Sequence, residues 1–269
     1  MEKRIFIATS GFYYPDWKGL FYPPELPREK YLTWYAEKFP FTELNFSYYR
    51  QPEPEQCRRF LESSPASFLF SIKAHRSLTH ERAPGWRDQA RLFLEGIRPL
   101  AEARRLAMVI LQFPYSFDYS RENRLYLGEL CSLLGESGEL PLGVEFRREG
   151  WNGSSAREEL KRREISWIVA DTPALKGLPR PEPVITSDTA YLRFHGRNEG
   201  AWWTGDNVTR YDYLYSRQEL AEWESLVKDM AGQVKRLFVA FNNHRKGQAV
   251  QNALELQSGL EPLLQIPQA

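Results

Sequence analysis

Short apolar runs recur along this chain, and most of them end in a charged or amide side chain. Runs of this length, separated by amphipathic stretches, are typical of the buried strands of a parallel sheet. The chain carries eight of them: Arg4–Thr9, Thr42–Phe46, Ser67–Lys73, Ala107–Gln112, Pro141–Phe146, Ser166–Asp171, Thr189–Phe194 and Arg236–Phe241.

Helical periodicity fills most of the intervals between these runs. Strand followed by helix, repeated, predicts parallel pairing with right-handed crossovers. Eight such units favour a closed barrel, because the turn Thr9–Pro15 lacks the glycine-rich fingerprint of an open dinucleotide-binding sheet. The predicted helices are Arg28–Phe39, Glu53–Ser63, Trp86–Arg104, Arg121–Leu134, Ser154–Arg163, Arg217–Met230 and Lys246–Leu256.

Two connections depart from this pattern. The segment Thr172–Pro183 carries four prolines, so we expect an irregular connection after the sixth strand. The segment His195–Arg217 is long and aromatic, and we expect it to fold over the barrel as a lid that includes Arg197, Trp202, Trp203 and Tyr211. We find no linker or repeat, and therefore predict one α/β domain over residues 1–269, a single parallel (β/α)8 TIM-type barrel.

Composition adds few constraints to this picture. The formal net charge of +1 gives no global steering of charged partners, so any affinity for anions must come from local clusters. The two cysteines, Cys57 and Cys131, do not form a disulfide framework. No apolar run approaches the ~18 residues of a membrane span, and the N-terminus reads as a strand rather than a signal peptide. We expect a cytoplasmic protein without membrane contact; the sequence does not determine its oligomeric state.

The carboxyl ends of the strands in such a barrel meet at one mouth, where its chemistry takes place. Glu145 and Asp171 end adjacent predicted strands, and we expect them to face each other as acid/base groups. His195 follows the seventh strand and would assist them near neutral pH. The alternative is that each carboxylate is a structural ion, paired with a neighbouring arginine.

The other side chains at the strand ends suit an anionic, polar ligand. Lys73, Arg147 and Arg193 would hold the anion, while the polar side chains Glu43, Asn45, Gln112, Asn242 and Asn243 would orient the rest of the ligand. Arginines could instead neutralise the carboxylates, and the asparagines could cap loops. A desolvated Lys73 could form a Schiff base, although a lysine at a strand end is more commonly a charge partner.

No cofactor or metal is predicted. Neither His-Glu-x-x-His nor Cys-x-x-Cys occurs, and four histidines are too scattered for a zinc cluster. Glu145 and Asp171 could hold a divalent cation, but the neighbouring cationic side chains would compete for the same carboxylates.

Short motifs at the ends of the predicted strands, taken in their order along the chain, resemble those of one family over nearly the whole sequence. The motifs are Ala8-Thr9-Ser10-Gly11-Phe12, Glu43-Leu44-Asn45, Phe70-Ser71-Ile72-Lys73, Leu111-Gln112-Phe113-Pro114, Val144-Glu145-Phe146-Arg147, Ala170-Asp171-Thr172-Pro173, Tyr191-Leu192-Arg193-Phe194-His195-Gly196 and Phe241-Asn242-Asn243. The sequence is similar to the YecE-like family, domain of unknown function number seventy-two. The resemblance implies a TIM-type barrel and no established activity.

Three functions follow from the sequence. The first is an enzyme, whether hydrolase, lyase or isomerase, that acts on an anionic polar ligand such as a phosphorylated sugar or nucleotide. The second is a nucleic-acid-binding protein or nuclease like the apurinic-endonuclease barrels, which is analogy at the level of the fold. The third is a barrel that binds a ligand without catalysis.

Overall fold

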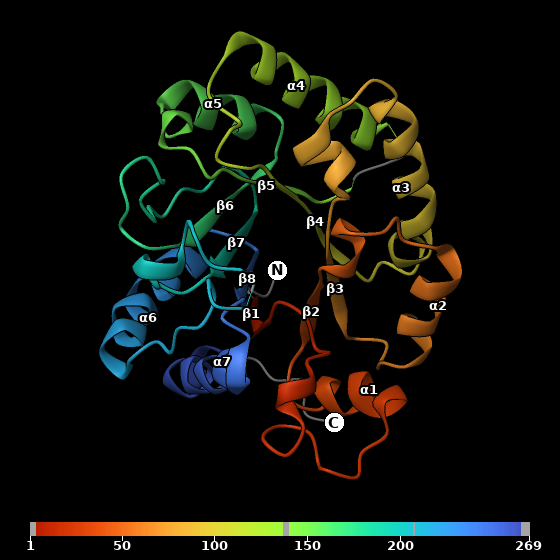
Figure 1. The fold of residues 1–269 in the computed structure, drawn as a ribbon, viewed down its shortest axis with the longest axis vertical. Coiled ribbons are helices and arrows are strands. Elements are labelled where there is room, and N and C mark those ends of the chain that lie inside the picture. Colours follow the sequence, from red (N-terminus) through yellow and green to blue (C-terminus); the bar gives the residue numbers. More distant parts are fainter. Residues whose placement is uncertain (1–3, 137–139, 207, 265–269) are drawn as a thin grey trace.

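A ring of eight parallel strands forms the centre of the molecule. The computed structural model describes residues 4–136, 140–206 and 208–264. Neighbouring strands follow the order β1-β8-β7-β6-β5-β4-β3-β2 (Figure 1). The strands are β1 (Arg4–Thr9), β2 (Phe41–Leu44), β3 (Leu69–Lys73), β4 (Leu106–Gln112), β5 (Leu142–Glu145), β6 (Ser166–Asp171), β7 (Thr189–Phe194) and β8 (Arg236–Phe241).

The ring closes between β1 and β2, at the carboxyl ends of the strands. A bridge there pairs Ser10 with Glu43, and the Gly11 amide donates to the Glu43 carbonyl at 2.8 Å. The predicted parallel (β/α)8 barrel is therefore confirmed. β5 and β6 share only two paired positions, whereas β1 and β8 share six, so backbone pairing is uneven around the ring.

Seven α-helices surround the ring in the described part of the chain (Figure 1). No helix lies between β6 and β7, a connection whose residues are all described, which confirms the irregular connection expected from the prolines. A π-helical turn at Ser77–Glu81 follows β3. The helices are α1 (Tyr31–Ala36), α2 (Pro54–Glu62), α3 (Trp86–Glu102), α4 (Arg121–Gly135), α5 (Ser154–Arg162), α6 (Arg217–Ala231) and α7 (Gln248–Leu260).

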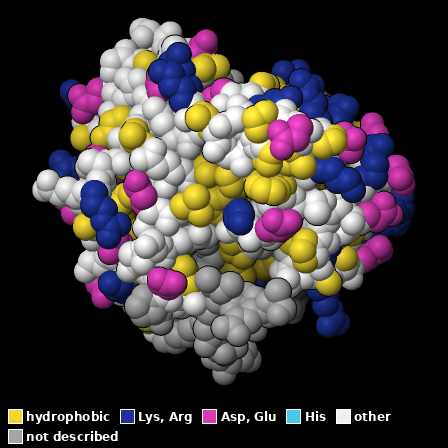
Figure 2. Space-filling view, turned by 90° about the horizontal axis from the view of Figure 1, so that it is seen from below, with side chains coloured by type: hydrophobic (Ala, Val, Ile, Leu, Met, Phe, Trp, Pro, Cys, Tyr) yellow, Lys and Arg dark blue, Asp and Glu magenta, His cyan; other side chains and the backbone are white. Residues whose placement is uncertain are grey.

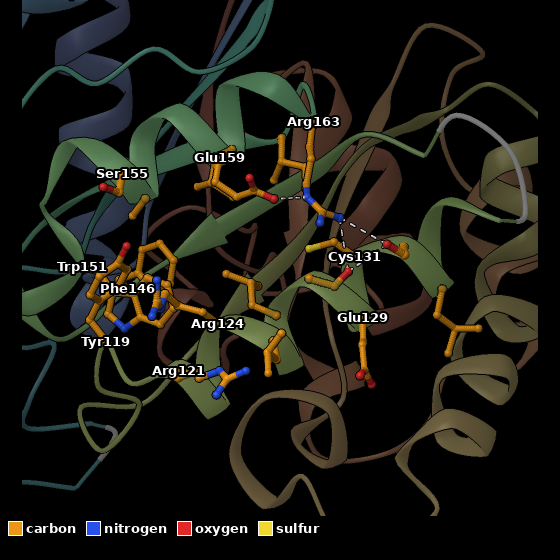
Figure 3. A pocket seen from close by; sticks show the side chains of 18 of the residues that line it. Tyr119, Arg121, Arg124, Glu129, Cys131, Phe146, Trp151, Ser155, Glu159 and Arg163 are labelled. Atoms are coloured by element: carbon orange, nitrogen blue, oxygen red, sulfur yellow. Dashed lines mark hydrogen bonds and ion pairs between the residues drawn. The ribbon is translucent and has the colours of Figure 1, made fainter.

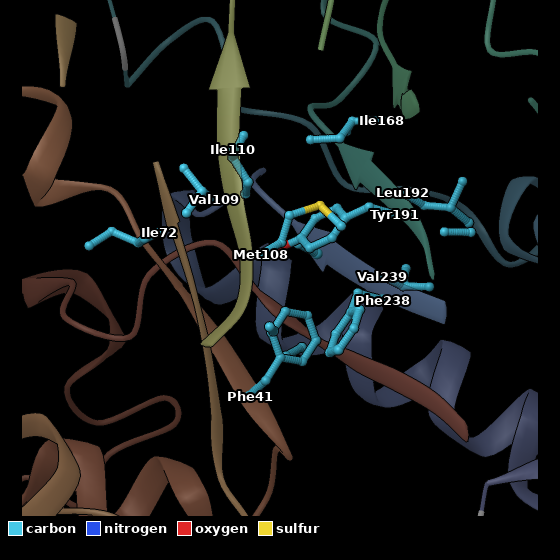
Figure 4. Close-up of a cluster of buried hydrophobic side chains, with 14 of the residues drawn as sticks. Phe41, Ile72, Met108, Val109, Ile110, Ile168, Tyr191, Leu192, Phe238 and Val239 are labelled. Atoms are coloured by element: carbon cyan, nitrogen blue, oxygen red, sulfur yellow. The ribbon is translucent and has the colours of Figure 1, made fainter. Parts of the chain in front are cut away.

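Large side chains fill the inside of the barrel below its mouth. Phe41, Met108, Tyr191 and Phe238 meet there (Figure 4), and the Phe41 and Phe238 rings lie 5.1 Å apart. Gly143 makes room for them: a Cβ at that position would lie 2.3 Å from Met108 Sδ. The inside of the barrel is thus a packed core rather than a channel, and only its upper layer is open to chemistry.

Charges of both signs are spread over the outer surface. Figure 2 shows the face on the side of α1 and α7, where hydrophobic side chains gather near the middle and acidic and basic ones are interspersed around them. No single sign dominates this face. Across the described chain, none of the helices combines the length and apolar character needed to cross a membrane.

Candidate functional site at the barrel mouth

Arg193 lies at the centre of the upper barrel layer and joins two opposite walls. Its Nε donates to Glu43 Oε2 at 2.9 Å and its Nη2 to Glu43 Oε1 at 2.5 Å. Its Nη1 donates to Glu145 Oε2. All three side chains are at most 2% exposed. Two carboxylates thus share one buried guanidinium, and Tyr191 adds a hydroxyl bond to Glu43 at 3.2 Å.

A second chain of contacts runs from Glu145 through Arg147 to His195. Arg147 Nε pairs with Glu145 Oε1 at 2.5 Å, and Arg147 Nη2 lies 2.9 Å from His195 Nε2. His195 Nε2 also lies 3.2 Å from Glu145 Oε1, and Asn242 Nδ2 lies 3.0 Å from His195 Nδ1. Both ring nitrogens of the imidazole are therefore in contact with polar side chains, which fixes the orientation of the ring.

The electrostatics of this cluster fix the charge states at neutral pH. Burial alone would raise the pKa of Glu145, but Arg147 and Arg193 hold it well below its ordinary value. Burial, reinforced by Arg147, lowers the pKa of His195 to about 3. Glu145 is therefore an anion and His195 a neutral imidazole, so neither is a proton donor at pH 7. The acid/base roles predicted for them gain no support from these environments.

Lys73 stands apart from this ion network. Its Nζ donates to Gln112 Oε1 at 2.7 Å and lies 4.1 Å from the centroid of the Tyr48 ring. Among the described residues it forms no ion pair. Burial, followed by the field of Arg193, lowers the pKa of the Lys73 ammonium to about 7. Lys73 is thus a group at the mouth whose pKa is shifted toward neutrality.

A cavity of about 1070 Å³ lies above these side chains. It is lined by Glu43, Asn45, Lys73, Gln112, Arg147, Arg193, His195 and Asn242, so eight of the eleven catalytic and ligand-binding positions predicted from the sequence meet there. Its upper walls are mostly aromatic. They comprise Tyr13, Tyr14, Phe46, Tyr48, Tyr49, Tyr115, Trp202, Trp203 and Tyr211.

The long connection after β7 covers one side of the cavity, as the sequence indicated. Trp202, Trp203 and Tyr211 line it, and the Arg147 guanidinium lies 5.3 Å from the Trp202 ring centroid. Arg197, the fourth predicted lid residue, is absent from the lining. Its Nε and Nη2 bind the Asp171 carboxylate at 2.9 and 2.6 Å.

Asp171 was expected to face Glu145, and the structure corrects this. Its carboxylate accepts from Arg197 and, at 2.7 Å, from Trp223 Nε1 on α6, and it does not line the cavity. Side chains alternate across a strand, so Asp171 lies on the outer face of β6, opposite to Ala170. Glu145 contacts Arg147 and Arg193, whereas Asp171 contacts Arg197 and Trp223, so the two carboxylates do not form the facing pair that was expected. Burial raises the pKa of Asp171 despite the bonds from Arg197.

Asn243 is also displaced from the expected site. Its amide donates to the Tyr213 carbonyl at 2.8 Å and to Asn252 at 2.9 Å, and it does not line the cavity. Asn252 in turn bonds both backbone groups of Tyr215. Asn243 therefore anchors the loop after β7, which is the capping role that the sequence left open.

Sequence reasoning overlooked much of the rim. His80, Arg76 and Tyr48 line the cavity without having been predicted. The Tyr48 ring centroid lies 4.9 Å from that of His80, and burial lowers the pKa of His80 to about 4. The aromatic run Phe46-Ser47-Tyr48-Tyr49 after the second strand was the available signal, since tyrosines so dense in a loop serve either packing or a ligand.

A second cavity, of about 790 Å³, lies outside the barrel between α4 and α5. Arg163 spans it by bonding Glu159 on α5 at 2.6 Å and Ser132 on α4 at 3.2 Å (Figure 3). Phe146 and Trp151 form its apolar end. In the parts of the chain that the structure describes, no three His, Cys, Asp or Glu side chains gather as a metal site would require.

Comparison with known proteins agrees with the fold. A family model described as "Protein of unknown function DUF72" matches residues 6–268. The UPF0759 protein YunF of Bacillus subtilis is 31% identical, over 96% of this chain and 98% of its own. The UPF0759 protein YecE of Escherichia coli O157:H7 is 26% identical, over 81% and 82%. The crystal structure of a DUF72 family protein from Thermotoga maritima superposes with a TM-score of 0.87 at 39% identity, over 96% and 99%.

Proposed function

The chain belongs to the DUF72 family, for which no activity is established, and we propose from its own site that it is an enzyme that binds an anionic, polar organic ligand at the barrel mouth. A phosphorylated metabolite is the simplest ligand of this kind. The main support for this proposal is the excess of positive charge in the cavity lining. Five cationic side chains line it against one carboxylate, Glu43: Lys73, Arg76, Arg147, Arg193 and Arg210.

The imbalance persists when the buried ion pairs are taken into account. Glu145 and Glu43 together neutralise Arg193 and Arg147, and Arg76 pairs with Glu81 at 2.9 Å. Lys73 and Arg210 are left without a carboxylate among the described residues. An anion would supply the missing negative charge, and its binding would be strengthened by the partly dry site.

Neutral groups would position the rest of the ligand. Asn45 Oδ1 is buried at the cavity and has no hydrogen-bond partner within the described structure. A buried acceptor left unpaired costs free energy, so a ligand hydroxyl or amine there would be favoured. Gln112 and Asn242 offer further amides. A sugar or a similar polyol that carries phosphate or carboxylate matches this set of groups.

The proposal that the ligand is chemically transformed rests on perturbed titration at the mouth. Sites that shift pKa values by burial and neighbouring charge are common in active centres. Lys73 has the proton affinity for acid/base work near pH 7. Glu145 and His195, predicted as catalytic from the sequence, would instead hold Arg147 and Arg193 in place for the ligand.

A nucleic-acid ligand is the second candidate, because aromatic rings at the rim are open to solvent. Tyr49 is 58% and Trp203 52% exposed, and both line the cavity. Bases stack on such rings. The net charge of +1 gives little general attraction for a polyanion, so we rank this candidate lower.

Calorimetric titration with matched metabolite pairs tests the proposal. We expect sugar phosphates to bind and their unphosphorylated counterparts to bind at least ~10-fold more weakly. Arg210→Met should weaken phosphate binding without breaking a buried ion pair. Arg58→Met is the control, because Arg58 pairs with Glu55 on the exposed surface and does not line the cavity.

A native protein that binds no phosphorylated or carboxylated metabolite would refute the proposal. Tight, salt-dependent binding of single-stranded DNA in its place would favour the second candidate. Binding without turnover of any ligand found would reduce the proposal to a non-catalytic barrel.

A further inference from the structure

We infer that Lys73 is an amine nucleophile that forms a Schiff base with the carbonyl group of an aldehyde or ketone ligand bound at the barrel mouth. This inference rests on the proposed function, since it requires the mouth to admit an organic ligand. It adds the substrate class, a phosphorylated or carboxylated carbonyl compound, and a covalent step.

The surroundings of Lys73 are those of a nucleophile rather than of a charge partner. Its side chain lines the cavity and donates to a neutral amide oxygen, Gln112 Oε1, at 2.7 Å. The face of Tyr48 covers it, with Nζ 4.1 Å from the ring centroid. No carboxylate pairs with it within the described structure. An ammonium in this setting gives up its proton more readily than one held by a carboxylate.

The charged groups around Lys73 act on its pKa in opposite directions. Arg193 and Arg147 disfavour the ammonium, while Glu145 and Glu43 favour it from within their own ion pairs with those arginines. His80 on the π-helical turn is neutral and adds no opposing charge. Burial first and the arginines second lower the Lys73 pKa to about 7, so a substantial fraction of the amine is unprotonated at neutral pH. An ordinary lysine would be unprotonated about a thousandfold less.

The backbone fixes the point from which the Lys73 side chain enters the cavity. Ser47 Oγ donates to the Lys73 carbonyl at 2.5 Å, and the Ala74 amide donates to the Ile110 carbonyl at 2.9 Å. Both bonds join the end of β3 to its neighbours, so Lys73 enters the cavity from a rigid wall. A fixed, desolvated nucleophile next to cationic groups that hold an anion is the arrangement that covalent carbonyl chemistry needs.

The step balances without any further reagent. The Nζ lone pair bonds to the carbonyl carbon, and the π electrons of the carbonyl move to its oxygen. That oxygen leaves as water, with one hydrogen from the amine and one proton from solvent. The product is a protonated C=N bond on Lys73, which water reverses.

Reductive trapping tests the inference. Pyridoxal 5′-phosphate serves as the probe because it carries an aldehyde and a phosphate, and cyanoborohydride reduces only the imine. We expect peptide mapping to find the adduct on Lys73, formed at pH 7.5 at least ~10-fold faster than on Lys38. Lys38 is the matched control: an exposed lysine whose Nζ lies 5.9 Å from the Trp34 ring centroid.

Variants separate chemistry from folding. Lys73→Met and Lys73→Arg should both remove the adduct, while Lys38→Met should leave it unchanged. Gln112→Glu places a carboxylate beside the amine, so trapping on Lys73 should fall at least ~10-fold at pH 7.5 and recover as the pH is raised. A purely structural role for Gln112 would not give this pH-dependent recovery.

The outcomes also distinguish this inference from the proposed function. If phosphate competes with the probe for the mouth but only surface lysines are trapped, the Schiff base is refuted and the anion site stands. If pyridoxal without phosphate labels Lys73 as fast as the phosphorylated probe, and calorimetry detects no phosphate binding, the amine chemistry stands and the anion site is refuted.

Discussion

Arg193 is the side chain on which the upper layer of the barrel depends. It binds a carboxylate from β2 and another from β5, and all three groups are almost fully buried. A buried charge that loses its partner keeps the cost of leaving water without the compensating attraction. Removal of one member of this ion network should therefore lower the free energy of unfolding by more than the whole network contributes to it.

Arg193→Met should destabilise the protein by ~3–5 kcal/mol, because it leaves Glu43 as an unpaired buried anion and Glu145 with Arg147 as its remaining arginine partner. Urea unfolding followed by circular dichroism measures this change. Arg58→Met is the control, since the Arg58–Glu55 pair is exposed and should matter little. Equal effects of the two substitutions would contradict the role assigned to Arg193.

His195 predicts a pH dependence of stability. Its folded pKa of about 3 lies below the unfolded value near 6.5, so between these values the unfolded chain binds a proton that the folded chain does not. The contribution is complete above pH 6.5 and is lost as the pH falls toward 3, by up to about 1.4 kcal/mol per pH unit. Denaturant titrations at pH 7, 6, 5 and 4 should show a shallower slope in His195→Asn. An unchanged slope would mean that His195 is charged in the native protein.

Residue identity at the mouth was predictable, but the direction of each side chain was only partly so. Glu145 and Arg147 are two positions apart, as are Arg193 and His195, and each pair shares one face of the chain. Asp171 shares its face with Val169, which points toward the helices. All residues of β6 except Ala170 are buried, so the hydrophobic pattern did not indicate which face of the strand points into the barrel.

At the scale of elements, the loop after β7 depends on a sharp turn at Gly196. Its φ is +86°, and a Cβ there would lie 2.6 Å from Tyr213 Cβ. The Gly196 amide also donates to the buried Tyr215 hydroxyl at 2.9 Å. This turn directs the chain from the barrel wall to Trp202 and Trp203 at the cavity.

Gly196→Ala should destabilise the protein by ~1–3 kcal/mol, because alanine rarely adopts this backbone conformation and would collide with Tyr213. Limited proteolysis should cut the loop of residues 196–216 faster than in the native protein. Gly200→Ala is the control within the same loop, since the nearest atom to its Cβ is 4.0 Å away. Equal cleavage in both variants would contradict this account.

Strand positions followed well from the sequence, whereas loop structure did not. Four of the eight strands, β1, β6, β7 and β8, have the predicted bounds. The second run was expected to reach Phe46, but β2 ends at Leu44 because Phe46–Tyr48 forms a 3-10 turn. Contacts such as Asn252 with Tyr215 join positions 37 residues apart, and no local pattern specifies them.

At the scale of the whole molecule, the barrel is held together unevenly. Only Gly143–Ser166 and Val144–Trp167 pair across β5 and β6, next to the cavity between α4 and α5. Across β7 and β8, six pairs form a continuous ladder. Segments held by fewer backbone hydrogen bonds need less free energy to open locally.

Amide hydrogen exchange should therefore be faster along the seam between β5 and β6 than along β7 and β8. Mass spectrometry of peptides that cover Ser166–Asp171 and Arg236–Phe241 measures this difference. Addition of a ligand at the mouth should slow exchange at Glu43 and Lys73 more than at the seam. Uniform protection around the ring would contradict this prediction.

Glu43 makes two different contacts across the barrel. Its backbone joins β1 to β2, and its side chain accepts hydrogen bonds from Arg193 on β7. The contact that closes the ring and the ion pair that holds Arg193 therefore depend on the same residue. A chain in which β1 and β2 are unpaired would lack an ordered Glu43–Arg193 pair at the cavity, so ligand binding would report on closure of the ring. Selection for ligand binding would therefore also select for a closed barrel. Variants that impair ligand binding would be hard to distinguish from variants that impair folding.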